Sequence, residues 1–78
     1  MIRILLFAEL QDIVGQRELT LEATDINVQE LRRHLLEQYP ELTGINNAMA
    51  AINEEYAEEQ TPVRDGDVVA FIPPVSGG

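Results

Sequence analysis

The sequence of 78 residues contains no cysteine and no lysine. Without cysteine, the chain can form no disulfide bond and no thiolate metal site, and it cannot carry sulfur as a persulfide on its own side chains. Without lysine, the chain cannot be the target of isopeptide chemistry directed at its own side chains. Any sulfur that the chain carried would therefore have to be held at its C-terminus.

Basic side chains are also few, because five arginines stand against 14 acidic residues and the formal net charge is −9. Nucleic-acid binding requires clustered Lys and Arg to neutralise phosphates, and the only such cluster is Arg32-Arg33. We therefore expect no nucleic-acid partner. The acidity has two explanations that the sequence leaves open. It keeps the protein in solution, or it steers the chain to a basic partner surface.

Long apolar runs are absent as well. No run approaches the length of about 18 residues that a membrane-spanning helix needs, and the first residues lack the pattern of a signal peptide. We expect a cytoplasmic protein with no membrane partner. Residues 1–78 should form one domain with one small core, since a chain of this size buries only about 60% of its unfolded surface.

The N-terminal part predicts a hairpin of two strands. Residues 2–7 form an apolar run, and the charge of Arg3 marks the outer face, so the even-numbered side chains should point inward. Residues 8–14 predict a connection with about one helical turn, which Gly15 closes at positive φ. Residues 16–22 alternate between apolar and polar side chains, as in a half-buried antiparallel strand.

A helix is predicted over residues 28–39. Asn27 and Glu30 have the spacing of a capping box at its N-terminus. Pro40 disfavours the α conformation at the residue before it and should end the helix. Apolar residues at helical spacing form one face, and polar residues lie off that face. The predicted inner residues are Val28, Leu31, Leu35 and Tyr39, and the predicted outer residues are Gln29, Arg32, Arg33 and Glu37.

The remaining residues predict a loop and further strands. Residues 41–48 have the composition of a loop, and short strands are expected at 49–52 and 56–57. Pro62 interrupts the strand pattern, and an Asp-Gly turn precedes the last strand at residues 67–72. This order of elements predicts an α+β fold, in which one main helix lies across one face of a mixed sheet of four to five strands.

Residues 73–78 are predicted to be a projecting tail. Pro73 and Pro74 would end the last strand because proline has no N–H to donate. Gly77 and Gly78 lack Cβ and could enter a channel too narrow for other residues. A C-terminal carboxylate becomes reactive once ATP converts it into an acyl-adenylate. A sulfur donor would then give a thiocarboxylate, whereas a thiol and then a lysine amine would give an amide-linked protein modifier.

The chain resembles one known family along essentially its whole length. The ending F-x-P-P-V-x-G-G at residues 71–78 is the most specific part, and residues 1–8, 50–53 and 65–67 fit the same family. The sequence is similar to the small subunits of molybdopterin synthase, which are ubiquitin-like sulfur carriers. The resemblance implies the β-grasp fold of ubiquitin, with the first and last strands side by side and parallel at the sheet centre.

The resemblance also implies a function in molybdenum cofactor biosynthesis. An adenylating enzyme would use ATP to activate Gly78, and a sulfur donor protein would convert it to a thiocarboxylate. The sulfur would pass to cyclic pyranopterin monophosphate within the large subunit of the synthase, in a heterotetramer of two small and two large subunits. Gly77 and Gly78 would form the reactive end of a non-catalytic sulfur-donor subunit. The body of the chain is expected to hold no cofactor, no metal and no active site of its own.

One face of the predicted sheet should bind partners. If the helix covers the other face, this one carries a contiguous apolar set that is typical of an interface. That set is Leu5, Phe7, Val68, Ala70 and Ile72. By resemblance, the large subunit and the adenylating enzyme would both bind there, although Ile72 stands where the family commonly has an aromatic. The residues to which the resemblance assigns partner contacts are Phe7, Tyr56, Ile72, Pro73, Pro74, Val75 and Ser76.

Three alternatives stay open. A sulfur carrier for thiamine or tRNA thiolation would have the same fold and diglycine, but usually a different run before it. A ubiquitin-like protein modifier would form lysine-linked adducts, and a passive interaction module would not need its last two residues. His34 has no nearby carboxylate pattern and is interpreted as a surface residue. The acidic residues near 54–59 lack the spacing of a calcium loop and predict a solvated face.

Overall fold

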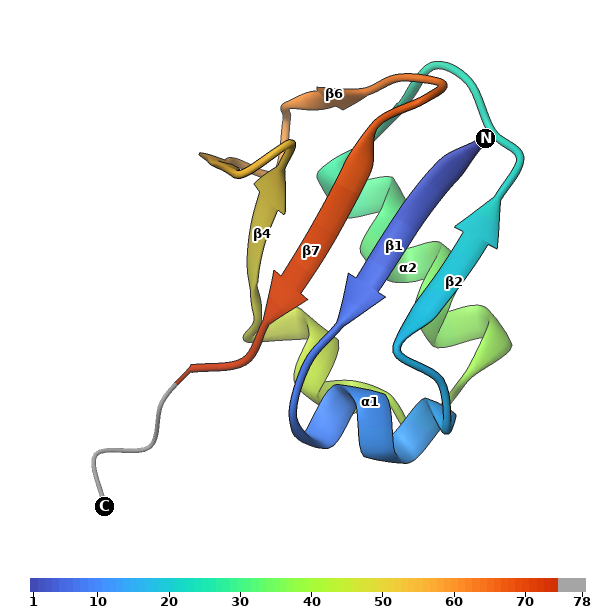
Figure 1. Cartoon of the computed structure of the whole chain (residues 1–78), viewed down its shortest axis with the longest axis vertical. Coiled ribbons are helices and arrows are strands. Elements are labelled where there is room, and N and C mark those ends of the chain that lie inside the picture. Colours follow the sequence, from blue (N-terminus) through green and yellow to red (C-terminus); the bar gives the residue numbers. More distant parts are fainter. Residues whose placement is uncertain (75–78) are drawn as a thin grey trace.

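A mixed five-stranded sheet with one long helix across one side organises the chain (Figure 1). The structure is a computed structural model and describes residues 1–74. Within the sheet the strands follow the order β2-β1-β7-β4-β5. Their bounds are β1 Ile2–Leu6, β2 Glu18–Leu21, β4 Met49–Ile52, β5 Glu55–Ala57 and β7 Val68–Ile72. The fold is the predicted ubiquitin-like β-grasp.

The first and last strands lie side by side at the centre of this sheet. β1 and β7 run parallel, with Arg3 opposite Val68 and Leu6 opposite Phe71. β2 pairs with β1 as the predicted antiparallel hairpin, and β4 pairs antiparallel with β7 on the other side. The arrangement that the resemblance implied is confirmed.

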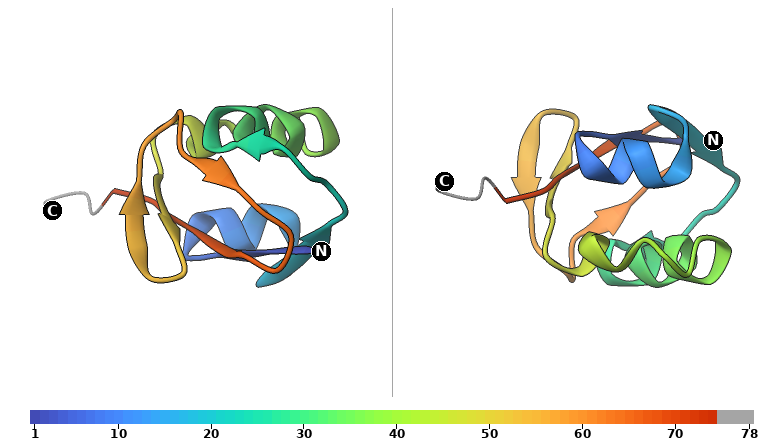
Figure 2. Two further views of the ribbon diagram at one scale, coloured as in Figure 1. Left: turned by 90° about the horizontal axis from the view of Figure 1, so that it is seen from above. Right: turned by 90° about the horizontal axis from the view of Figure 1, so that it is seen from below.

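The core lies between the sheet and helix α2, which spans Val28–Gln38 (Figure 2). Alternation along β1 and β7 sends every second side chain into this layer, as the sequence predicted for β1. Each large apolar side chain that is fully buried stabilises the fold by about 1.5–3 kcal/mol. The fully buried residues of these three elements are Ile2, Ile4, Leu6, Val28, Leu31, Leu35, Val69 and Phe71.

The capping box at the start of α2 is confirmed. The N–H of Glu30 donates to Oδ1 of Asn27 at 2.8 Å, and the N–H of Asn27 donates to Oε1 of Glu30 at 3.1 Å. These two bonds satisfy backbone donors that a helix N-terminus leaves free. The helix ends one residue before the predicted Tyr39, which becomes its C-cap and precedes Pro40.

Two connections are more regular than the sequence predicted. Residues Glu9–Val14 form helix α1, which buries Leu10, and Gly15 follows it at the expected positive φ of +83°. The prediction of a plain loop over residues 41–48 is wrong, because Thr43–Asn46 form a 3₁₀ helix, η1, with Ile45 buried. Leu10 and Ile45 from these two segments pack into the hydrophobic core.

A second, two-stranded sheet was not predicted. β3 at Ile26–Asn27 pairs antiparallel with β6 at Pro62–Val63, and Val63 is fully buried. Pro62 interrupts a longer strand pattern, as expected, but it is tolerated in a two-residue strand that needs few ladder bonds. The pairing ties the start of α2 to the segment that leads into β7.

The prediction that Arg32 lies on the outer side of α2 is wrong. Its side chain is only 8% exposed, and its guanidinium donates to the carbonyls of Ile45 and Ala48 and to Glu59. The distance is 2.7 Å to Ala48 and 3.0 Å to the Glu59 carboxylate. Carbonyl groups at the end of η1 are thereby paired in a region with little access to water.

Among residues 1–74, no helix has the length and apolarity to cross a bilayer.

Candidate docking groove and C-terminal tail

The face of the sheet opposite α2 carries a shallow apolar groove of about 650 Å³. We call this the outer groove. Strands β1, β7 and β4 form its floor, and the β4–β5 turn and β5 form one wall. Its lining residues are Leu5, Phe7, Ala51, Asn53, Glu54, Tyr56, Val68, Ala70 and Ile72.

The hollow shape follows from small side chains in the middle of the sheet. Ala51 on β4 pairs directly with Ala70 on β7 and with Tyr56 on β5. Two methyl groups therefore lie where larger side chains would fill the surface, while bulkier residues stand around them. Phe7 is 40% exposed and Tyr56 is 73% exposed. Aromatic side chains held open to solvent around a small-residue floor are typical of a surface that a partner covers.

The structure brings together all the residues of the body that the sequence predicted for this face. Phe7 follows directly after β1, Tyr56 lies at the centre of the edge strand β5, and Ile72 is the last residue of β7. All three line the outer groove, together with the predicted Leu5, Val68 and Ala70. Their assigned contacts with partner proteins stay predictions.

Asn53 fixes the turn that forms the wall of the groove. Asn53 and Glu54 both have positive φ, +50° and +74°, as in the two-residue turns that suit a β-hairpin. The side-chain oxygen of Asn53 accepts from the N–H of Val68 at 3.0 Å, and its amide donates to Asp67 at 3.0 Å. The β4–β5 turn is thus attached to the start of β7. Hydrogen bonds from the Arg64 N–H and from Asn53 lower the pKa of the Asp67 carboxyl.

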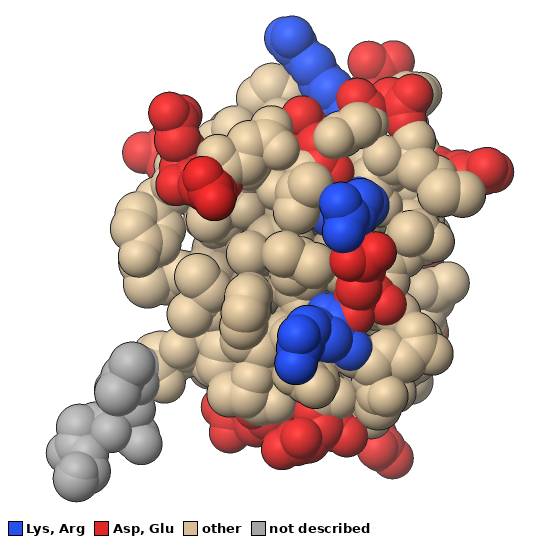
Figure 3. Space-filling view, in the orientation of Figure 1, with Lys and Arg blue, Asp and Glu red and all other residues tan. Residues whose placement is uncertain are grey.

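On one side of the outer groove the charged side chains are acidic, and on the other side basic and acidic side chains lie next to one another (Figure 3). Acidic side chains gather at the β4–β5 turn, where Glu54 and Glu55 are exposed. On the β1–β2 side, Arg3 donates to Glu18 at 2.7 Å, and this bond lowers the pKa of Glu18 and raises that of Arg3. Arg3 is therefore neutralised within the chain, whereas the glutamates of the turn are left facing solvent.

Comparison with known proteins identifies the family. The model of the ThiS family matches residues 4–78. This chain belongs to the ThiS family. It is 38% identical to the molybdopterin synthase sulfur carrier subunit of Caenorhabditis briggsae, over 99% of this chain and 96% of that protein. The predicted resemblance to this group of sulfur carriers is confirmed.

Solved structures agree with this assignment. The ThiS-family chain is 27% identical to a chain in the protein-protein complex of subunits 1 and 2 of molybdopterin-converting factor from Helicobacter pylori, with a TM-score of 0.72 over 99% of this chain and 97% of that one. It is also similar to the small archaeal modifier protein 1 (SAMP1) from Methanosarcina acetivorans. Here the identity is 25% and the TM-score 0.83, over 99% of this chain and 95% of that one.

In this ThiS-family chain the tail begins beside the outer groove. Ile72 ends β7, and Pro73 and Pro74 follow it at the edge of the sheet where β4 begins (Figure 1). The strand that supplies Val68, Ala70 and Ile72 to the groove therefore continues into the tail. The predicted site residues Val75, Ser76, Gly77 and Gly78 lie outside the described residues, and their functions stay predictions.

The sequence reasoning missed three lining residues of the groove and one neighbour. Ala51, Asn53 and Glu54 line it, and Met49 lies on the same side of β4, opposite Ile72. Residues 49 and 51 have the same parity in a strand that was itself predicted, so alternation could have placed them on one face. Which face this is depends on the pairing of β4 with β7, and no local pattern reveals that pairing.

Proposed function

We propose that this chain is the sulfur-carrier subunit of a molybdopterin synthase and acts in molybdenum cofactor biosynthesis in the cytoplasm. One observation carries the proposal, namely a sequence similarity that covers nearly the whole chain and extends through the diglycine end. The Helicobacter pylori structure, in which a similar chain is complexed with a second subunit, supports a large-subunit partner. The outer groove offers a surface for that partner beside the origin of the tail.

The chemistry of the proposed carrier takes place at Gly78. Its carboxylate oxygen attacks the α-phosphorus of ATP on an adenylating enzyme, pyrophosphate leaves, and an acyl-adenylate results. The persulfide of a sulfur donor protein then displaces AMP and forms an acyl disulfide. A second thiol cleaves its S–S bond, so that a thiocarboxylate remains on Gly78. A thiocarboxylic acid is far more acidic than an alkyl thiol, so the sulfur is anionic at pH 7 without a nearby base. This suits a chain that supplies a nucleophile rather than an active site.

Transfer takes place in the large subunit. Gly77 and Gly78 enter its pocket, and the sulfur attacks cyclic pyranopterin monophosphate to give a thioester. Water then cleaves the bond between the sulfur and the Gly78 carbonyl, so that the sulfur stays on the pterin and the carrier regains its carboxylate. Two carriers in turn build the dithiolene of molybdopterin, in a heterotetramer of two small and two large subunits. The cations and general acids for this step come from the large subunit.

The outer groove serves both partners in turn. Phe7, Tyr56 and Ile72 contact first the adenylating enzyme and later the large subunit, so the carrier cannot bind both at once. Pro73 and Pro74 restrict the direction of the tail because proline fixes φ. The exposed glutamates of the β4–β5 turn attract a basic partner surface, and docking should therefore be faster at low salt.

A second candidate function is that of a protein modifier. The similarity to the small archaeal modifier protein 1 supports it, and the fold is shared with the carriers. In this case the acyl-adenylate would pass to a thiol and then to a lysine amine of another protein, because this chain has no lysine. A carrier for thiamine or tRNA thiolation would have the same activated end but a different acceptor.

An intact mass spectrum tests the proposal. The protein is incubated with ATP, the adenylating enzyme and a sulfur source, and we expect the mass gain of one oxygen replaced by sulfur, located on the fragment that contains Gly78. Gly78→Ala is the control, since it should keep the fold and the complex with the large subunit but impair sulfur loading. An unchanged mass would overturn the proposal, and adducts on lysines of other proteins would favour the modifier.

A further inference from the structure

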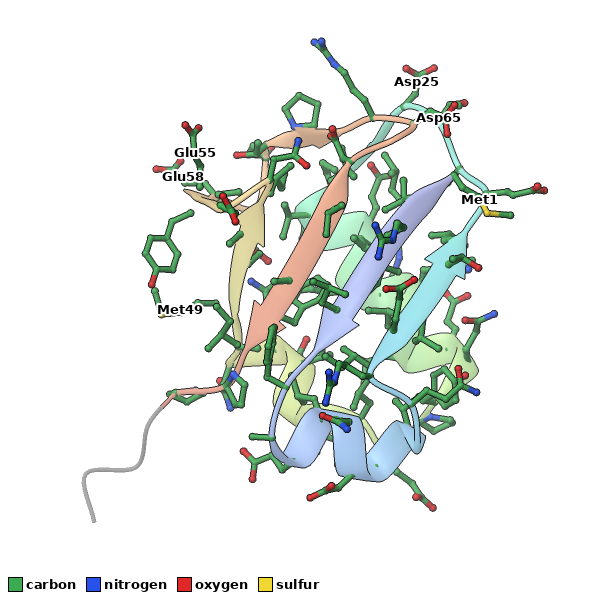
Figure 4. The ribbon with its side chains drawn as sticks, viewed as in Figure 1. Met1, Asp25, Met49, Glu55, Glu58 and Asp65 are labelled. Carbon is green, nitrogen blue, oxygen red and sulfur yellow. The ribbon has the colours of Figure 1, made fainter. Side chains whose placement is uncertain are left out.

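Met49 extends the outer groove toward the origin of the tail. It is the first residue of β4 and lies directly opposite Ile72 in the antiparallel β4–β7 ladder. Met49 and Ala51 share one face of the strand, and Ala51 lines the groove. The Met49 side chain is 49% exposed and stands at the outer edge of the sheet in Figure 4. A single exposed apolar residue is ordinary, but this one continues an apolar groove up to the last strand residue before the tail.

The chain has only one other methionine and no cysteine. Met1 is 56% exposed and lies at the opposite end of β1, where its ammonium group pairs with Asp65 (Figure 4). The two thioethers are therefore similarly open to solvent, but only Met49 adjoins the outer groove. Before Gly78 is loaded with sulfur, a mild oxidant reacts first with these two methionine sulfurs, because methionine and cysteine are the side chains most readily oxidised.

We propose that Met49 is a contact residue for the large subunit and that its oxidation to the sulfoxide weakens docking. The inference rests on the proposed function, because it takes the large subunit as the occupant of the outer groove. Two observations support this occupant, namely the complex formed by a similar chain and the continuity of Met49 with the groove through Ile72. A flexible, polarisable thioether adapts well to an apolar partner surface.

The modification itself is a two-electron oxidation. A peroxide transfers one oxygen atom to the thioether sulfur, so that an S–O bond forms and the O–O bond breaks. With hydrogen peroxide the reduced product is water. The sulfoxide is polar, and burying it against an apolar surface without a hydrogen-bond partner is unfavourable. A sulfoxide at Met49 should therefore raise the Kd for the large subunit about tenfold.

The first test measures the binding of five forms of the full chain to the large subunit by calorimetry. Untreated protein and Met49→Leu should bind alike, since leucine keeps the apolar contact. Peroxide-treated protein should bind about tenfold more weakly, and Met49→Gln should mimic this loss without any oxidant. Peroxide-treated Met49→Leu, which is oxidised only at Met1, is the matched control and should bind like the untreated protein. Thermal unfolding of each form verifies the fold.

The second test uses the two methionines as reporters of the complex. Peptide mass spectrometry follows the oxidation of each by hydrogen peroxide, with and without saturating large subunit. We expect oxidation of Met49 to slow at least fivefold in the complex and oxidation of Met1 to keep its rate. Equal rates at Met49 in both samples, or an unchanged Kd for the treated protein and for Met49→Gln, would overturn the inference. If the untreated chain fails to bind the large subunit at all, the proposed function is what fails.

Discussion

The guanidinium of Arg32 lies over the ring of Phe71, 5.3 Å from its centroid. This contact connects the middle of α2 to the strand that supplies the groove and continues into the tail. Through its other bonds the same side chain holds the end of η1 and Glu59. One buried arginine thus joins four segments that are distant in sequence. Its replacement should therefore lower the stability of the whole fold.

Arg32→Met is expected to lower the free energy of unfolding by about 2 kcal/mol. Methionine fills much of the same volume, but the carbonyls of Ile45 and Ala48 lose a buried donor, which is costly. Urea unfolding followed by circular dichroism measures the difference. Arg33→Met is the matched control on the exposed side of the same helix and should stay within about 0.5 kcal/mol. Equal stability of the two variants would mean that the buried bonds contribute nothing net.

Glu54→Gly should stabilise the protein by about 0.5–1 kcal/mol. Glu54 has a φ of +74°, a conformation that is unfavourable for a residue with a Cβ and free of strain for glycine. Glu55→Gly is the matched control, because Glu55 lies within β5 and glycine there should lower stability by about 0.5–1 kcal/mol. The two variants lose the same charge at adjacent positions, so opposite signs in urea unfolding would isolate the backbone effect. A decrease in both would contradict it.

Asp67→Asn should change how stability depends on pH. The hydrogen bonds from Arg64 and Asn53 lower the folded-state pKa below the ordinary value of 3.8, so the carboxylate stabilises the fold fully above that value. Its contribution is lost as the pH falls through the folded-state pKa. The urea midpoint of the wild type should therefore exceed that of the variant at pH 7 and converge toward it below about pH 3. A constant difference from pH 7 to pH 2 would rule out this origin.

Phe7→Asp should raise the Kd for the large subunit at least about 100-fold and leave the fold intact. The change places a charge at the edge of the outer groove, where an aromatic anchor would otherwise be covered. Calorimetric titration with the large subunit measures the effect. Ile13→Asp is the control, because Ile13 on α1 is 41% exposed, like Phe7 at 40%, but does not line the groove. Similar losses in both variants would show that the groove is not the binding surface.

Elements with a local signature could be predicted from the sequence. The alternation in residues 2–6 needs only the charge of Arg3 to orient it, and the capping box needs only two side chains three residues apart. The α+β class followed from the order of such elements. Their arrangement in space came from the resemblance, because nothing local distinguishes a parallel β1–β7 pair from other pairings.

Features that depend on distant partners could not be predicted in this way. Arg32 has the helical position of an outer residue, and its burial becomes favourable through Glu59 and through the carbonyls of Ile45 in η1 and of Ala48 just after it, 13 and 16 residues further along. The β3–β6 ladder joins segments of two residues each, which are too short for a periodic pattern. The same holds for Ala51 and Glu54 in the groove, since their place depends on the β4–β7 register.

The central pairing of β1 with β7 has a consequence for synthesis on the ribosome. The strand made first has no neighbour on one side until Val68–Ile72 has left the exit tunnel, so the sheet cannot be completed before that point. Pairing β1 with β7 also closes a loop that contains most of the chain, and such long-range pairing slows folding. Since the outer groove is built from both strands, a nascent chain that still lacks β7 has no complete surface with which to engage an assembly partner.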